Sequence, residues 1–104
     1  ITILIAFGQW SCSIAQESKE KVVVGAERTY TYFKDLKGKR IGVVSNQTSL
    51  IGTTHIVDSL IYAGFNVVKA FGPEHGFRGS AGAGEEIDSN IDAKTGIPVI
   101  SLYG

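Results

Sequence analysis

Arg40-Ile41-Gly42-Val43-Val44-Ser45 and Asn66-Val67-Val68-Lys69-Ala70-Phe71 are the two stretches that decide the fold class. Both are short, apolar at the centre and rich in β-branched residues, as strands are. The chain between them predicts a helix, capped by Thr53 or Thr54, that runs to about Ala63. Strand, helix and strand at this spacing predict a parallel βαβ unit, which is right-handed in nearly all proteins. The continuous apolar centre of residues 40–45 also predicts a strand that is buried on both faces.

Further elements extend this unit in both directions. Val22-Val23-Val24 predicts a short strand, and Thr29–Leu36 predicts a helix with Phe33 and Leu36 on one face. Residues 97–102 predict another apolar strand after a long glycine-rich connection. The predicted fold class for residues 22–104 is therefore α/β, a parallel sheet with flanking helices.

The first residues predict export. Residues 1–15 are apolar and end in Ser13-Ile14-Ala15, the small-residue pattern that signal peptidase requires, so we interpret them as the remnant of a signal peptide. Residues 16–21 are polar and predict a linker. The expected location is periplasmic or secreted, with no membrane association after cleavage. Alternatively, Cys12 could be the acceptor cysteine of a lipoprotein, although Gln9-Trp10-Ser11 fits that motif poorly.

Composition argues against several classes of function. The chain has 104 residues with ten basic and ten acidic side chains, so it offers no net charge to attract nucleic acid. The glycine-rich run 79–84 lacks the lysine and Ser/Thr of a phosphate-binding loop, and we expect no cofactor. No His- or Cys-rich spacing indicates a metal site. The carboxylates Glu85, Glu86, Asp88 and Asp92 are therefore interpreted as a solvated acidic stretch.

The densest chemistry lies in Phe71-Gly72-Pro73-Glu74-His75-Gly76-Phe77-Arg78-Gly79, directly after a predicted strand. Glu74 or His75 could transfer a proton, and Arg78 offers a planar fork that suits a carboxylate. Apolar neighbours such as Phe71 and Phe77 would favour a protonated Glu74. The alternative is an ordinary solvated loop.

Asn46 follows the neighbouring predicted strand. Because ligands in open parallel sheets bind beyond the carboxyl ends of the strands, Asn46 and the loop after Gly72 are expected to face one cleft. His55 and Asp58, on the predicted helix, are interpreted as surface residues.

Three ordered motifs resemble the exo-β-N-acetylmuramidase NamZ family: residues 39–48, 71–79 and 92–104. The resemblance implies an exo-acting glycosidase that releases terminal N-acetylmuramic acid from peptidoglycan fragments. The implied partners of the protein are therefore peptidoglycan-derived saccharides. Carried onto this chain, it makes Glu74 and His75 the catalytic candidates and Asn46, Arg78 and Tyr103 the substrate-binding ones. Family proteins are several-fold longer, so the resemblance implies that residues 22–104 form a partial Rossmann-like N-terminal catalytic domain. It also implies that a C-terminal domain is missing and that residues 1–104 alone are inactive.

Glycoside hydrolysis usually needs two carboxyl groups. Glu85, Glu86 and Asp92 are possible partners for Glu74, and the second group could equally lie beyond Gly104. The other function that fits the same loop is a non-catalytic module that binds a sugar or a peptidoglycan fragment.

Overall fold

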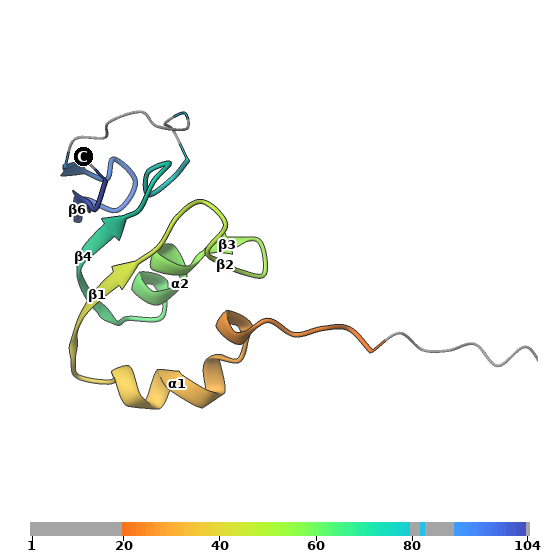
Figure 1. Ribbon diagram of the computed structural model, residues 1–104. Helices are drawn as coiled ribbons and strands as arrows, with labels where there is room; N and C mark the ends of the chain where they lie inside the picture. The colour runs from red at the N-terminus through yellow and green to blue at the C-terminus, as the bar shows by residue number, and fades with distance from the viewer. Residues whose placement is uncertain (1–19, 80–81, 83–88, 104) are drawn as a thin grey trace, which may run out of the picture.

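The computed structural model describes residues 20–79, 82 and 89–103. The predicted signal remnant, most of the linker, and Glu85, Glu86 and Asp88 lie outside these residues. The α/β fold class is confirmed by a four-stranded sheet in the order β1-β4-β6-β5 (Figure 1). β1 (Arg40–Val44), β4 (Asn66–Gly72) and β6 (Pro98–Ser101) are parallel, and β5 (Asn90–Ile91) is antiparallel to β6. The remaining elements are η1 (Gly25–Glu27), α1 (Thr29–Leu36), the hairpin of β2 (Leu50–Ile51) and β3 (Thr54–His55), and α2 (Ile56–Tyr62).

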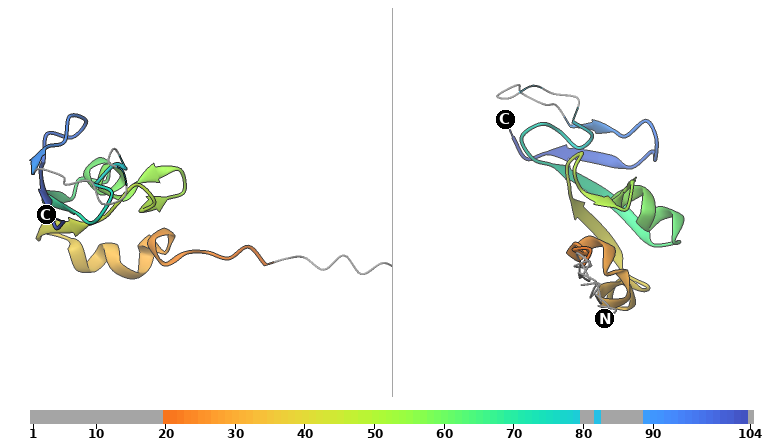
Figure 2. Two further views of the ribbon diagram at one scale, coloured as in Figure 1. Left: turned by 45° about the horizontal axis from the view of Figure 1, so that its top comes forward. Right: turned by 90° about the vertical axis from the view of Figure 1, so that its right-hand side faces the viewer.

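The predicted βαβ unit is present as β1-α2-β4. α2 and the β2–β3 hairpin lie on the same side of the two strands (Figure 2). Val57 and Leu60 of α2 form the core with Val67, Ala70 and Val99 of the sheet. Removing these apolar side chains from water is the main favourable term that holds the helix on the sheet.

A β-bulge adapts β4 to this core. The register passes from Ile41↔Val67 to Gly42↔Lys69, so Val68 has no partner on β1. The extra residue lets Val67 and Ala70, three apart in sequence, both reach the core. Simple alternation along the strand would have placed them on opposite faces.

Two strand predictions are wrong. Residues 22–24 form no strand, and Val22 is 85% exposed, because β-branched residues need a partner strand and none of the described residues pairs with them. β1 is not buried on both faces. It is an edge strand of the sheet, and Val44 is 67% exposed on the face that α2 does not cover.

The start of α2 also differs from the prediction. Thr53 and Thr54 belong to the β2–β3 hairpin, and His55 is the N-cap, with Nδ1 accepting a hydrogen bond from the Val57 amide at 3.3 Å. The amide of Ile56 donates to the carbonyl of Ser49 at 2.8 Å. The helix therefore starts directly from the hairpin, which leaves no room for a threonine cap.

α1 has the predicted bounds and packs through its apolar face. The Phe33 ring meets the Phe65 ring edge-on, with centroids 4.7 Å apart, next to the start of β4. Among the described residues, no helix is both long and apolar enough to span a bilayer.

The carboxyl ends of the three parallel strands meet at one edge of the sheet. The Ser45 amide donates to the Phe71 carbonyl at 3.0 Å, and the Leu102 amide donates to the Gly72 carbonyl at 2.8 Å. The segments that follow β1, β4 and β6 therefore start side by side. They carry Asn46, residues 73–79 and Tyr103 respectively.

Candidate functional site

The chain turns sharply as it leaves β4. The Gly76 amide donates to the Pro73 carbonyl at 3.0 Å, which closes a four-residue turn with Glu74 and His75 at its centre. A Cβ atom on Gly72 would lie 2.9 Å from the Phe77 nitrogen, so only glycine lets the turn fold back this closely. His75 has a φ of 118°, at the turn position where type II turns place glycine.

Glu74 and His75 are differently exposed on this turn. Glu74 is exposed, His75 is half-buried, and neither side chain makes a hydrogen bond or ion pair within the described part of the chain. Among the described residues, Glu74 does not have the expected apolar shelter. Phe77 is buried in the core against His55, and Phe71 lies over Gly42. Phe77 does not shelter Glu74 because the back-folded turn directs the Phe77 ring into the core.

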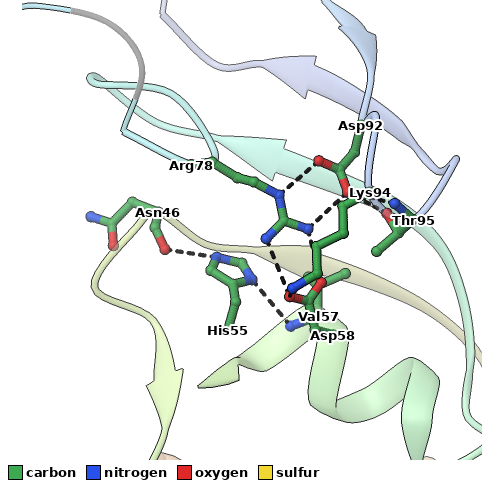
Figure 3. Close-up of polar contacts among 8 residues, drawn as sticks. All are labelled: Asn46, His55, Val57, Asp58, Arg78, Asp92, Lys94 and Thr95. Carbon is green, nitrogen blue, oxygen red and sulfur yellow. Dashed lines mark hydrogen bonds and ion pairs between the residues drawn. The ribbon is translucent and has the colours of Figure 1, made fainter. Parts of the chain in front are cut away.

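Arg78 lies between two carboxylates from distant parts of the chain (Figure 3). Its Nε donates to Asp92 Oδ1 at 2.7 Å, and its Nη2 donates to Asp92 Oδ2 and Asp58 Oδ1, both at 2.8 Å. Its Nη1 donates to Asp58 Oδ2 at 3.3 Å. These bonds use four of the five N–H groups of the guanidinium.

Asp58 and Asp92 are not the solvated groups that the sequence suggested. Their side chains are 11% and 6% exposed. The hydrogen bonds from Arg78 lower the pKa of both carboxyls below the ordinary range and raise the pKa of Arg78. Lys94 adds a second cation at Asp58, and Thr95 donates to Asp92 through its amide at 3.0 Å. The two carboxylates stay ionised because each has positively charged or N–H partners.

His55 is buried rather than on the surface. Its Nδ1 accepts from the Val57 amide, so Nε2 carries the proton and donates to the Asn46 carbonyl at 2.9 Å. Its ring meets Phe77 edge-on at 4.7 Å, and the Arg78 guanidinium carbon lies 4.8 Å from the Phe77 ring centre. Both ring nitrogens are used structurally. The contacts of His55 with Asn46 and Phe77, and of Phe77 with Arg78, therefore join the end of β1 to Arg78.

Asn46 organises the turn that follows β1. Its Oδ1 accepts from the Thr48 amide at 3.0 Å and from the Thr48 hydroxyl at 2.8 Å. A Cβ on Gly79 would lie 2.9 Å from Gln47 Cβ, so residues 46–49 and the end of the 73–79 segment are in contact. The turn after β1 and segment 73–79 therefore meet at the edge of the sheet where the sequence places both. That Asn46 and this segment face one cleft stays a prediction.

Tyr103 follows β6 at the same edge. It is exposed, and its amide donates to Ser101 Oγ at 3.2 Å. No hydrogen bond within the described residues joins its side chain to Glu74, His75 or Arg78.

Two hollows flank Arg78. One of about 250 Å³ lies between residues 76–78 and the β5–β6 region, with Gly72, Asp92 and Ser101 in its wall. The other, of about 350 Å³, lies between the β2–β3 hairpin and α2 and is lined by His55, Asp58 and Lys94 among others. Glu74 lines neither.

The described residues include no group of three or more His, Cys, Asp or Glu side chains that could hold a metal ion.

The acid side of the stability profile is expected to depend on Asp92. Its lowered pKa means that its stabilising effect is complete above the unfolded-state value, near 4, and is lost as the pH falls toward the folded-state value. Asp92→Asn should therefore lower the melting temperature of this domain in the complete protein most above pH 5. The difference should shrink steadily toward pH 2. Asp35→Asn, an exposed carboxyl on α1, is the matched control and should show no such trend. A difference in melting temperature between Asp92→Asn and the wild type that is constant with pH would contradict this prediction.

Sequence reasoning gave three residues of this cluster other roles: it interpreted His55 and Asp58 as surface residues, and Asp92 as a solvated carboxylate or a possible partner for Glu74. One signal was present. Asp92-x-x-Thr95 has the spacing of a capping contact, in which a carboxylate accepts from the amide three residues on, and the Thr95 amide donates to Asp92 in this way. No local pattern marks Asp58, because its partner Arg78 is 20 residues away in sequence.

Comparison with known proteins supplies the family. The model of the family described as exo-beta-N-acetylmuramidase NamZ, N-terminal, matches residues 41–104. The chain is 44% identical over 89 residues to the peptidoglycan beta-N-acetylmuramidase NamZ of Bacillus subtilis (strain 168). That alignment covers 83% of this chain and 22% of the relative.

Two solved structures of DUF1343 family proteins from Bacteroides fragilis NCTC 9343 are also similar. The first has 49% identity and a TM-score of 0.63, covering 75% of this chain and 20% of that one. The second has 40% identity and a TM-score of 0.61, covering 73% and 18%. The chain thus spans about a fifth of the length of these relatives. With a family model that matches more than half of its residues, this chain belongs to the exo-β-N-acetylmuramidase NamZ family, in the N-terminal region of that family's proteins.

Proposed function

We propose that the complete protein containing residues 1–104 is an exported, exo-acting glycoside hydrolase that releases terminal N-acetylmuramic acid from peptidoglycan fragments. Family membership and the name of the Bacillus subtilis relative support the reaction class. The observation that carries the site assignment is the turn after β4. It leaves Glu74 exposed at the carboxyl edge of a parallel sheet, beside a histidine in a strained conformation.

Glu74 is the proposed general acid. Its carboxyl proton passes to the glycosidic oxygen as the bond from that oxygen to C1 of the N-acetylmuramic acid breaks. Water adds to C1 and loses a proton to the second carboxylate or, after a covalent intermediate on that carboxylate, to the deprotonated Glu74. His75, adjacent on the turn, is proposed to assist this proton transfer. The second carboxyl group and the apolar shelter that Glu74 lacks among the described residues are proposed to come from other parts of the complete protein.

Asn46, Arg78 and Tyr103 are proposed to contact the saccharide. Arg78 has one N–H left, so it can give a substrate carboxylate only a single hydrogen bond in this arrangement. The side-chain nitrogen of Asn46, which has no partner within the described residues, is a further donor. Neutral donors of this kind orient a sugar without requiring a charged pocket.

The test is the product released by the complete protein from two matched substrates. One is a peptidoglycan fragment with N-acetylmuramic acid at its non-reducing end, and the other carries N-acetylglucosamine there. Free N-acetylmuramic acid, detected by mass spectrometry, is expected only from the first. Absence of release from both would contradict the proposal.

The second candidate is a sugar-binding module, which the exposure of Glu74 favours, because a general acid usually needs a sheltered carboxyl group. Tight binding of the first fragment without any cleavage would support the module. Calorimetric titration with the same two fragments distinguishes this outcome from a protein that simply does not recognise them.

A further inference from the structure

The cluster around Arg78 connects the Glu74 turn to two separate elements. Arg78 lies four positions after Glu74 in the same segment. One carboxylate that holds it comes from the first turn of α2, and the other comes from the connection between β5 and β6. Both carboxylates bind it through two oxygens, which restricts the guanidinium plane as well as its position.

The turn itself is held by few local contacts. One backbone hydrogen bond, from Gly76 to Pro73, closes it. The positive φ of His75 opposes it, because a non-glycine residue is strained in this region of backbone conformation. A strained turn persists only when its surroundings over-determine it. The contacts after the turn are the buried Phe77 ring and the clamped Arg78.

The charges of the cluster balance. Arg78 and Lys94 carry two positive charges, and Asp58 and Asp92 carry two negative ones. A cluster with no net charge and four of five guanidinium donors already used is poorly suited to capture an anion. It is well suited to hold a side chain in place.

We propose that Asp58 and Asp92 are positioning residues that hold the Glu74–His75 turn through Arg78. The conformational part of this inference stands on the geometry, and its catalytic consequence rests on the proposed function. The carboxylates fix Arg78, Arg78 fixes the carboxyl-terminal end of segment 73–79, and the turn presents Glu74 in one orientation. Loss of either carboxylate is expected to loosen the turn without unfolding the sheet.

Hydrogen exchange of the complete protein tests the conformational part directly. In Asp58→Asn and Asp92→Asn, amides in residues 71–79 are expected to exchange about ten-fold faster, whereas those in β1 should not change. Asp58→Asn is the cleaner variant, since Asp92 also binds the Thr95 amide and hydroxyl of its own turn. Asp35→Asn, on the exposed side of α1, is the matched control. Unchanged exchange in 71–79, or equal acceleration throughout the domain, would overturn the proposal.

Kinetics with the N-acetylmuramic acid substrate test the consequence. Positioning predicts that kcat falls about ten-fold in Asp58→Asn while KM stays within two-fold. Arg78→Lys should give the same kcat loss, and the double variant should add little, because the two residues act as one unit. A rise in KM with unchanged kcat and normal exchange would show that Arg78 only contacts the substrate and does not position the turn, which would overturn the proposal. If the wild-type protein cleaves nothing but the exchange pattern is as expected, the proposed function fails and the positioning role stands.

Discussion

Replacing Glu74 with Gln in the complete protein is expected to lower the turnover of an N-acetylmuramide by about 10²- to 10⁴-fold, the range typical of a lost general acid. The substitution keeps the size of the side chain and removes only the proton-donating ability. Glu74 makes no hydrogen bond or ion pair within the described residues, so the fold should not respond. Substrate affinity and melting temperature should therefore stay near the wild-type values.

The measurement is the steady-state release of N-acetylmuramic acid from a peptidoglycan fragment, whose sugar leaving group needs protonation, together with a thermal melt. Glu20→Gln, an exposed glutamate before η1, is the matched control and should keep full activity. A leaving group that needs no protonation should recover most of the lost rate in Glu74→Gln, which separates acid catalysis from simple misplacement. Hydrolysis of the peptidoglycan fragment that persists at the wild-type rate would remove Glu74 from the mechanism.

His75→Gly is expected to reduce turnover by about 10²-fold or more while leaving stability unchanged or higher. Glycine adopts a φ of 118° without strain, so the variant relieves the cost that histidine imposes on the turn. The greater freedom of glycine in the unfolded chain offsets part of that gain, about 0.4–1 kcal/mol. A residue kept at a strained position at the expense of stability is expected to be kept for its side chain.

The check is a paired measurement of kcat and melting temperature in the complete protein. His75→Ala provides the comparison, since alanine also lacks the imidazole but retains the backbone strain. It should lose activity to the same degree and melt at a lower temperature than His75→Gly. Wild-type activity in the glycine variant would show that the imidazole has no part in the reaction.

The β1-α2-β4 unit shows how much of the fold could be predicted from the sequence. Local composition predicts β1 and β4 because apolar β-branched runs of this length favour strands, and it gives the bounds of α1 correctly. Prediction from local composition failed where a strand depends on a neighbouring strand. Residues 22–24 have strand propensity but no neighbouring strand, and β5 has two residues that are recognisable only by their pairing with β6.

The candidate site was likewise predicted only in part from the sequence. The sequence places Asn46 and segment 73–79 at one edge, because residues that follow neighbouring parallel strands must leave the sheet at the same end. It does not show that Arg78 is bound by Asp58 and Asp92, or that Phe77 turns away from Glu74 into the core. The pairing of side chains 14 and 20 residues apart depends on how α2 and the β5–β6 connection pack.

By itself, then, the sequence determined the α/β class, the motifs of the family and the concentration of Glu74, His75 and Arg78 in one short segment. Only the tertiary structure decided which of them is exposed, which is strained and which is clamped. The physical reason is that strand propensity and turn chemistry act over a few neighbouring residues. Burial, ion pairing and backbone strain are instead set by groups that the folded chain brings together.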